Sequence, residues 1–259
     1  MALDYEGFKG EIFRLTKIDL NAYKERQMKR RIDALIGKRS AKSYTDYVAL
    51  LKSDKVAFDE FVNYLTINVS EFYRNPEQWM TLEKEIFPQL ITRIGKNLKI
   101  WSAACSTGDE PYSLVMLLSK LMPLNNIKII ATDIDKQVLE KAQLGLYNDK
   151  SLKALPKEFV RDYFTVINEK TYQISDKIKS RVEFKQHNLL KDPYPTNCDL
   201  IVCRNVLIYF TEDAKMEIYS KFNGALKKDG ILFVGSTEQI IQPQNLGYSA
   251  QKSFFYRKL

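Results

Sequence analysis

The stretch LKIWSAACSTGDEPYSL, residues 98–114, decides the fold of this chain. Residues 98–102 form a short apolar run typical of a buried strand, and residues 111–121 have the apolar spacing of a helix. Small residues between them allow a ligand to approach the backbone closely. An open α/β sheet receives nucleotide-like ligands at such a strand-to-helix turn, so we expect a ligand site here.

This turn differs from the two common phosphate-binding loops. It has neither the GxGxxG spacing of a dinucleotide site nor the GK[ST] sequence of a P-loop. Asp109 and Glu110 stand at the start of the following helix, where a diphosphate would meet like charge instead of free N–H groups. The turn therefore favours a ligand that carries positive charge.

Short strand-like runs alternate with amphipathic helical segments after Lys96. The predicted strands are residues 98–102, 127–132, 182–186, 200–203, 231–235 and 253–257, and the predicted helices are residues 111–121, 136–144 and 212–226. This alternation predicts a doubly wound α/β domain with a mostly parallel sheet. Residues 147–181 interrupt the alternation, so we expect a small inserted subdomain there.

The first 75 residues have a different character. They contain no proline and only three of the chain's ten glycines. Apolar residues recur at helical spacing in three stripes, which begin at Met28, Tyr44 and Phe58. We therefore predict a small all-helical domain and linker over residues 1–76, followed by the α/β domain over residues 77–259.

Composition sets further limits on the class of protein. A chain with 45% hydrophobic and 28% charged residues is ordinary for a globular protein. Its apolar runs are far shorter than the roughly 20 residues of a membrane span, and no signal-peptide pattern opens it, so we expect a cytoplasmic protein without membrane insertion. Three cysteines without a CxxC pair and a single histidine predict buried free thiols and no metal site.

The segment ATDID, residues 131–135, places Asp133 at the carboxyl end of the next predicted strand. In dinucleotide-binding α/β folds, an acidic side chain at this position accepts hydrogen bonds from the hydroxyl groups of a ribose. Taken alone, Asp133 or Glu110 is better explained as a helix cap than as a ligand contact. Together they fit S-adenosylmethionine, with Asp133 on the ribose and Glu110 near the positively charged methionyl group.

Two further polar segments follow later strands, QHNLL at residues 186–190 and CRNVLIYF at residues 203–210. We expect Asn188 to bond the edge of an adenine and Leu189 to cover its face. His187 is then a solvent-facing or locally bonded histidine beside the site. Three residues of the second segment lie where α/β sheets direct their reactive groups: Arg204, Asn205 and Tyr209.

Four segments together resemble the CheR-type chemotaxis receptor methyltransferases. They are NVSEFYR at residues 68–74, WSAACSTGDEPYS at residues 101–113, ATDID and CRNVLIYF. The resemblance spans nearly the whole chain, and four long motifs in the family's order are far more specific than one glycine loop. It implies a Rossmann-like class I S-adenosylmethionine-dependent methyltransferase domain with a small inserted subdomain, preceded by the all-helical domain.

The resemblance also implies which residues form the site. Those expected to contact the cofactor are Asn68, Ser70, Arg74, Glu110, Asp133, Asn188, Leu189, Arg204 and Asn205. Ser70 stands where some relatives have threonine, and it retains the hydroxyl group. Arg74 and Tyr209 resemble the residues of the reaction centre in this family.

The implied reaction is methyl transfer to glutamate side chains of bacterial chemoreceptors, which gives glutamate methyl esters and S-adenosylhomocysteine for chemotactic adaptation. A glutamate carboxylate has an ordinary pKa of about 4.3, so it is an anion at neutral pH and needs no general base. The motifs accordingly contain no His or Cys base. We assign Arg74 to holding the carboxylate and Tyr209 to orienting the methyl group or the acceptor.

Basic residues crowd the segment between Lys24 and Lys42. Apolar residues occupy the inner face of this predicted helix, so we expect the cations to lie on its outer face. We expect them to form a substrate-binding surface that consists of Lys24, Arg26, Lys29, Arg30, Arg31, Lys38 and Arg39. A solvated helix face is the ordinary explanation of such a charge run. The resemblance favours an acidic helix of the chemoreceptor cytoplasmic domain as partner, and the absence of aromatic residues from Lys24 to Ser43 disfavours nucleic acid.

An alternative to the enzyme is a catalytically silent sensor of S-adenosylmethionine or S-adenosylhomocysteine, although the presence of both Arg74 and Tyr209 favours the enzyme. An RNA methyltransferase is disfavoured because no NPPY-type sequence follows the fourth strand. We expect a monomer, since no long apolar stripe is left unassigned. Residues 165–181 are short for the β-subdomain that docks a receptor tail peptide in some relatives, so we predict weak or absent docking.

Overall fold

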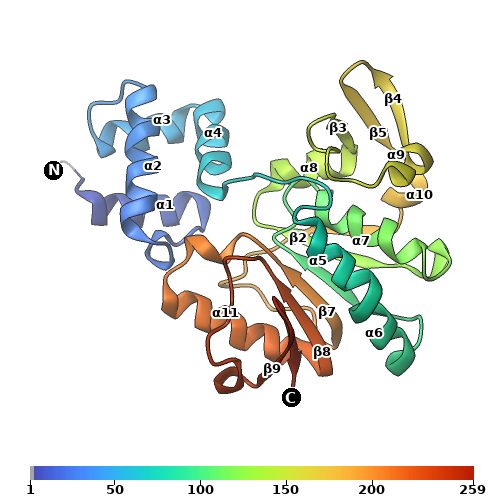
Figure 1. The fold of residues 1–259 in the computed structure, drawn as a ribbon. Coiled ribbons are helices and arrows are strands. Elements are labelled where there is room, and N and C mark those ends of the chain that lie inside the picture. The colour runs from blue at the N-terminus through green and yellow to red at the C-terminus, as the bar shows by residue number, and fades with distance from the viewer. Residues whose placement is uncertain (1–2) are drawn as a thin grey trace. The chain divides into compact units, whose positions relative to one another are not determined.

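The computed structural model describes residues 3–259, which form two compact units (Figure 1). The first contains the residues up to Asn68 together with Val206–Glu217. The second contains Val69–Asn205 together with Ile218–Leu259. Two distant stretches of sequence thus meet within each unit.

The first unit is helical, with α1 (Tyr5–Thr16), η1 (Leu20–Ala22), α2 (Glu25–Lys38), α3 (Tyr44–Ser53) and α4 (Lys55–Thr66). The side chains of Asp4, Ser43 and Asp54 accept hydrogen bonds from the first turns of α1, α3 and α4, as expected of these residue types at helix starts. The buried core takes most of its residues from the three predicted stripes: Phe8, Ile12, Met28, Ile32, Leu35, Tyr47, Val48, Leu51, Phe61 and Leu65. The prediction of a small all-helical domain is confirmed.

The second segment of this unit contains a 3-10 turn, η4 (Leu207–Tyr209). The N–H of Lys24 donates to the carbonyl oxygen of Tyr209 at 2.9 Å. The ring of Phe210 stacks on the ring of Tyr23, with 4.6 Å between their centroids. The backbone of Tyr209 is therefore held by the residue that precedes α2. Lys24 and Tyr209 are 185 positions apart, so the local sequence gave no sign of this contact.

The second unit, within residues 69–259, is built on a seven-stranded sheet in the order β6-β2-β1-β7-β8-β10-β9. Its strands are β1 (Ile100–Ala103), β2 (Ile129–Asp133), β6 (Val182–Gln186), β7 (Cys198–Cys203), β8 (Leu226–Val234), β9 (Tyr248–Lys252) and β10 (Phe255–Lys258). Neighbours from β6 to β8 run parallel, whereas β10 is antiparallel to β8 and β9. The predicted mostly parallel, doubly wound sheet is confirmed.

The helices and short turns of this unit have the bounds α5 (Pro76–Thr81), η2 (Leu82–Ile86, a π-helical turn), α6 (Phe87–Ile94), α7 (Asp109–Ser119), η3 (Leu124–Asn126), α8 (Lys136–Leu144), α11 (Glu212–Ala225, shared with the first unit) and η5 (Pro243–Leu246). Helix α8 and strand β6 coincide with their predicted ranges. Helix α7 begins two residues earlier than predicted. Strand β9 was not predicted, because its sequence, YSAQK, exposes polar side chains at the sheet edge.

The predicted insertion is a separate small sheet in the order β3-β5-β4, formed by β3 (Leu146–Asn148), β4 (Phe164–Asn168) and β5 (Thr171–Ile174). Helices α9 (Lys157–Tyr163) and α10 (Asp176–Lys179) flank its strands in the sequence. Figure 1 shows this subdomain in yellow, apart from the main sheet of its unit. The expectation of a small inserted subdomain is confirmed.

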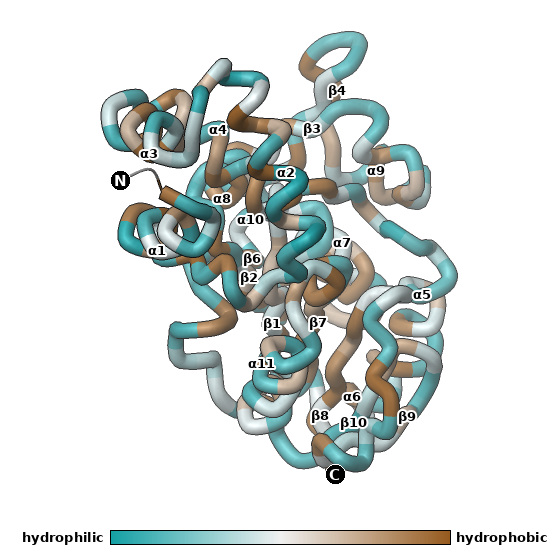
Figure 2. The backbone as a smooth tube through the Cα atoms, turned by 90° about the vertical axis from the view of Figure 1, so that its left-hand side faces the viewer, coloured by the Kyte–Doolittle hydropathy of each residue, from teal (hydrophilic) through white to brown (hydrophobic). Residues whose placement is uncertain are grey.

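The core of the second unit follows its central strands. Strands β1 and β7 are buried along their whole length, which explains why their sequences are mostly apolar and do not alternate; Ser102 and Asp199 are the buried polar exceptions. Figure 2 shows hydrophobic residues along β7 and β8, and polar residues dominate the surface helices. The three cysteines are free and buried, as predicted. No helix in residues 3–259 combines the length and apolarity that a membrane span requires.

Candidate active site

The turn between β1 and α7 has an unusual backbone. Ala104, Ser106 and Gly108 all have positive φ angles, of 62°, 49° and 87°. A Cβ atom on Gly108 would lie 2.9 Å from the Cβ of Ala142, so only glycine fits there without displacing α8. The N–H of Cys105 donates to the carbonyl oxygen of Thr132 at 2.8 Å, which ties the turn to the end of β2.

Asp133 lies at the carboxyl end of β2 and is almost fully buried. One carboxylate oxygen, Oδ2, accepts a hydrogen bond from the N–H of Ser106 at 2.8 Å, and Oδ1 accepts one from the N–H of Asp135 at 3.0 Å. Burial raises the pKa of Asp133 to about 6, although these backbone donors oppose the shift. Its position and its remaining lone pairs fit a carboxylate that accepts from a diol.

Glu110 lies in the first turn of α7, and only 13% of its side chain is exposed. Its Oε1 accepts a hydrogen bond from the hydroxyl of Ser102 at 2.8 Å, and its Oε2 lies 3.5 Å from Nη1 of Arg204. Burial raises the pKa of Glu110, and the charge of Arg204 opposes this shift. A second negative charge is thus held near the end of β1, where a cationic ligand group is favoured.

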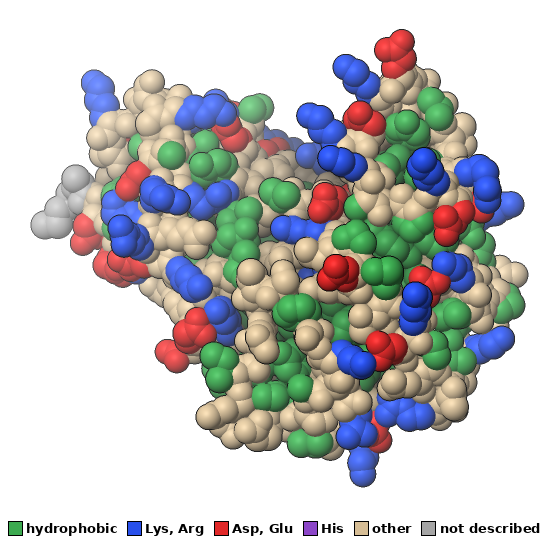
Figure 3. Space-filling view, viewed as in Figure 1, with side chains coloured by type: hydrophobic (Ala, Val, Ile, Leu, Met, Phe, Trp, Pro, Cys, Tyr) green, Lys and Arg blue, Asp and Glu red, His purple; other side chains and the backbone are tan. Residues whose placement is uncertain are grey.

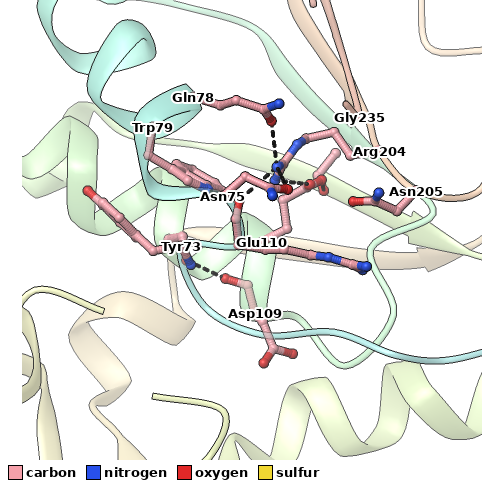
Figure 4. Close-up of polar contacts among 12 residues, drawn as sticks. Tyr73, Asn75, Gln78, Trp79, Asp109, Glu110, Arg204, Asn205 and Gly235 are labelled. Atoms are coloured by element: carbon pink, nitrogen blue, oxygen red, sulfur yellow. Dashed lines mark hydrogen bonds and ion pairs between the residues drawn. The ribbon is translucent and has the colours of Figure 1, made fainter. Parts of the chain in front are cut away.

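Arg204 follows β7, and its side chain is only 2% exposed. Its Nη2 donates to the carbonyl oxygen of Arg74 at 2.7 Å, to Asn75 Oδ1 at 3.2 Å and to Gln78 Oε1 at 2.7 Å (Figure 4). Burial lowers the pKa of this guanidinium, whereas Glu110 raises it. Nη1 and Nη2 of Arg204 are therefore directed at protein groups, whereas its buried Nε has no hydrogen-bond partner among the described residues.

Asn205 has a φ angle of 60°, and its N–H donates to Glu238 Oε2 at 2.6 Å. The same oxygen accepts from the N–H of Gly235 at 2.8 Å. A Cβ atom on Gly235 would lie 2.5 Å from this oxygen, so the close approach requires glycine. Glu238 is a buried part of the site region that the sequence analysis missed, and its signal was an acidic residue in the segment GSTE directly after β8.

The segment after β6 is locally bonded. Asn188 Oδ1 accepts from the N–H of Leu190 at 2.9 Å, and the N–H of Asn188 donates to Asp192 Oδ2 at 2.8 Å. Leu189 is buried. His187 is also buried, its Nε2 lies 3.3 Å from the carbonyl oxygen of Pro193, and burial lowers its pKa. Of the two expectations for His187, local bonding is correct and a solvent-facing ring is wrong.

Two predicted linker residues lie in the second unit. The hydroxyl of Ser70 bonds the carboxylate of Asp109, a buried residue whose pKa is raised by desolvation and whose Oδ2 accepts from Thr107 Oγ1 at 2.5 Å. Arg74 is partly exposed and donates from Nη1 to the carbonyl oxygen of Val69 at 3.2 Å. Asp109 was considered only as a negative charge at the helix start, so its bond to the linker was missed.

The remaining predicted site residues, Asn68 and Tyr209, belong to the helical unit. Nδ2 of Asn68 donates to Thr66 Oγ1 at 2.8 Å. The side chain of Tyr209 is partly exposed at the end of η4. Within the second unit, the structure brings together the strand ends and turns that carry Asp133, Glu110, Arg204 and Asn205.

The basic residues of α2 divide into two groups. Four of them contact other groups of the helical unit: Lys29 with Asp33, Arg31 with the carbonyl oxygen and ring of Tyr64, and Lys38 and Arg39 with Glu60. Arg26 and Arg30 are exposed, and no ion pair to them is found within residues 3–259, while Lys24 is exposed near Glu212. Figure 3 shows Lys and Arg side chains on the visible face of this unit. The expectation that all seven face outward is wrong for Arg31, which packs on α4.

The site offers a cationic, ribose-containing cofactor two buried carboxylates from neighbouring elements. Two other polar atoms of the turn, Ser106 Oγ and Asp109 Oδ1, are buried without a hydrogen-bond partner among the described residues. Buried polar atoms are normally satisfied, so these two fit a polar ligand that lies against the turn. The residues present therefore fit S-adenosylmethionine.

A Rossmann-like sheet with these carboxylates at its strand ends defines an S-adenosylmethionine-dependent methyltransferase. The family model "CheR methyltransferase, SAM binding domain" matches residues 68–254, and "CheR methyltransferase, all-alpha domain" matches residues 3–66. The chain therefore belongs to the CheR methyltransferase family. It is a protein-glutamate O-methyltransferase that methylates chemoreceptors with S-adenosylmethionine.

Curated relatives share this match. The chemotaxis protein methyltransferase of Listeria monocytogenes is 41% identical over 98% of this chain and 97% of its own length. That of Listeria innocua is 40% identical over the same shares of the two chains. That of Escherichia coli is 37% identical over 74% of this chain and 68% of its own length. The resemblance inferred from the four motifs is confirmed.

Proposed function

We propose that this protein is a monomeric cytoplasmic enzyme whose α/β domain, residues 77–259, binds S-adenosylmethionine, and whose helical domain and linker, residues 1–76, bind the receptor. The observation that carries the proposal is the pair of buried carboxylates at Asp133 and Glu110. Asp133 binds the ribose diol, because its two oxygens are already oriented by backbone N–H donors and retain lone pairs. Glu110 lies near the ammonium group of the methionyl part.

The adenine lies against the segment after β6, where Leu189 covers its face and Asn188 bonds its edge. The local turn at Asn188 uses its backbone N–H and its Oδ1, which fixes the side chain beside Leu189. We also assign contacts with the cofactor to Asn68 and Ser70, which belong to the linker, and to Asn205, which follows β7.

Arg204 acts on the cofactor through Glu110 rather than by direct contact. Its side chain is 2% exposed, and three acceptors of the protein occupy Nη2. Its Nη1 lies 3.5 Å from Glu110 Oε2, so it orients the carboxylate and maintains its negative charge. This assignment revises the direct contact that the resemblance implied.

Catalysis depends on positioning the acceptor carboxylate relative to the methyl group more than on proton transfer. S-adenosylmethionine supplies a methyl group on a positively charged sulfur. The acceptor glutamate is already ionised at neutral pH, so the protein must hold its carboxylate oxygen at near-attack distance. We assign this to the guanidinium of Arg74, which matches a carboxylate geometrically, and we assign Tyr209 to orienting the methyl group or the acceptor.

The receptor surface that we propose is narrower than the one expected from sequence. Arg26, Arg30 and Lys24 are exposed on α2, whereas Arg31, Lys38 and Arg39 are engaged within the helical unit. An acidic helix of the chemoreceptor cytoplasmic domain fits these exposed cations, and nucleic acid does not, because the exposed cations have no interleaved stacking aromatics.

The test is transfer of a radiolabelled methyl group from S-adenosylmethionine to a purified chemoreceptor cytoplasmic fragment, followed by alkaline treatment. Release of volatile methanol identifies a base-labile methyl ester and supports the proposal. Cofactor binding without transfer to any receptor fragment would favour a silent sensor of the cofactor instead.

A further inference from the structure

The carbonyl oxygen of Arg74 is held by two buried side chains. It accepts a hydrogen bond from Nη2 of Arg204 at 2.7 Å and a second one from Nε1 of Trp79 at 2.9 Å. Trp79 is 1% exposed, and the Arg204 side chain 2%. A backbone carbonyl with two fixed donors in a water-poor environment has little freedom to move.

Both donors are themselves fixed by rings and charges. The guanidinium of Arg204 lies 4.8 Å from the ring centroid of Phe233 and 5.6 Å from that of Trp79. Glu110 lies beside Nη1, and Asn75 and Gln78 accept from Nη2; Figure 4 shows these three residues converging on the guanidinium. The cluster therefore restrains Arg74 from β7, α5 and α7 at once.

The backbone on either side of Arg74 is strained. Tyr73 has a φ of 54° and Asn75 a φ of 62°, and the left-handed conformation is unfavourable for a residue other than glycine, above all for a bulky one such as Tyr73. Phe72 and Tyr73 are buried, whereas Arg74 is partly exposed. The ring of Tyr73 stacks on that of Trp79 at 5.0 Å. The strained turn thus presents Arg74 outward while its neighbours stay in the core.

We infer that Trp79 and Arg204 are positioning residues for Arg74, which they hold through its backbone carbonyl. The inference rests on the proposed role of Arg74 in holding the acceptor carboxylate. Neither Trp79 nor Arg204 touches the reactants. Their loss shifts the guanidinium of Arg74 away from the acceptor oxygen, and a misplacement of about 1 Å costs up to roughly 100-fold in rate.

Trp79→Phe is the decisive variant because it removes the Nε1 donor and keeps an aromatic ring against Tyr73. We expect kcat for receptor methylation to fall about tenfold, with the Kd for S-adenosylhomocysteine, measured by calorimetry, unchanged within about twofold. Arg204→Lys should lower kcat at least as far, since a single ammonium group lacks the planar fork that reaches the acceptors of Nη2 and Glu110 at the same time.

The matched control is Tyr248→Phe. Tyr248 donates from its hydroxyl to the carbonyl oxygen of Tyr219 at 2.8 Å, so this variant also loses one buried bond from an aromatic side chain to a backbone carbonyl. It should lower the melting temperature as Trp79→Phe does and leave kcat unchanged. A purely structural role of Trp79 predicts the same pattern for both variants.

The inference is overturned if Trp79→Phe retains the kcat of the parent enzyme, or if kcat and cofactor affinity fall together. Should Trp79→Phe not fold, Gln78→Leu removes an acceptor of Arg204 at similar volume and must lower kcat selectively. Arg74→Ala distinguishes failure of the proposed function from failure of this inference. If Arg74→Ala keeps full kcat, the proposed role of Arg74 is wrong. If Arg74→Ala loses kcat and the Trp79 and Arg204 variants do not, only the positioning role of Trp79 and Arg204 is wrong.

Discussion

The strand ends of the α/β unit and the outer face of α2 both carry functional charge, but they carry it in opposite ways. Asp133, Glu110 and Arg204 are buried and held by named partners at hydrogen-bond or ion-pair distance. Arg26 and Arg30 are exposed, and their charges are screened over about 8–10 Å at ordinary ionic strength. Fixed, desolvated charge suits recognition of one small cofactor, whereas mobile charge suits capture of a large helical surface.

The largest effect is expected on cofactor affinity when the buried carboxylate of Asp133 is removed. Asp133→Asn removes a negative charge that accepts from the ribose, and hydrogen bonds to charged groups are worth about 1.5–3 kcal/mol, so the Kd for S-adenosylmethionine should rise roughly 10- to 100-fold. Titration calorimetry measures this directly. Asp176→Asn, at a highly exposed residue of α10, is the control and should bind as the parent protein does. An unchanged Kd in Asp133→Asn would remove Asp133 from the cofactor site.

The same buried carboxylate predicts a pH dependence. Its pKa of about 6 in the ligand-free protein lies above the ordinary value because burial disfavours the charge. The ribose hydroxyls donate to the ionised form, so affinity should be full well above pH 6 and fall by up to about tenfold per pH unit below it. Binding measured from pH 5 to 8 checks this, and Asp133→Asn should lose the slope. A slope that persists in that variant would assign the titration to another group.

Tyr209→Phe probes chemistry in place of affinity. The variant lacks the hydroxyl group that we assign to orienting the methyl group or the acceptor carboxylate. We expect kcat to fall about tenfold and the Kd for S-adenosylhomocysteine to stay nearly unchanged. Steady-state kinetics with a receptor fragment, together with calorimetry, separate the two quantities. Equal losses of turnover and of affinity would contradict the division of roles between Tyr209 and Asp133.

The smallest effect is expected on α2. The double variant Arg26→Ala, Arg30→Ala should lower kcat/KM for a receptor fragment about three- to tenfold at low salt, and the difference should vanish near 0.5 M salt because exposed charges act mainly on the association rate. Lys38→Ala removes one positive charge that is paired with Glu60, and it should change kcat/KM less than Arg26→Ala or Arg30→Ala alone. A rate insensitive to ionic strength would argue against electrostatic receptor docking.

Much of the fold was predictable because it rests on local pattern. The ranges of α8 and β6 match the prediction, and the buried apolar stripes of the helical unit lie where 3.6-residue spacing placed them. Edge strand β9 and helices α5 and α6 were missed. Strand β9 owes its form to pairing with β10 and not to its own polar sequence.

The partners of the charged residues were less predictable. Sequence indicated that Arg204 belongs to the site, but its bonds to Arg74, Asn75 and Gln78 span about 130 residues. Glu238 and Asp109 were missed as partners for the same reason. Seven cations looked equivalent on α2, and only the packing of α2 on α4 showed that Arg31 faces inward.

By itself the sequence determined the family, the α/β class and the place of Asp133 at the carboxyl end of a parallel strand, because these follow from residue types at short, regular spacing. Tertiary structure alone decided which charges are buried and what each one holds. It showed that Arg204 contacts the carbonyl oxygen of Arg74 and the carboxylate of Glu110, and that Lys29, Arg31, Lys38 and Arg39 have partners within the helical unit. The physical reason is that desolvation and hydrogen-bond partnership depend on neighbours brought together only by folding.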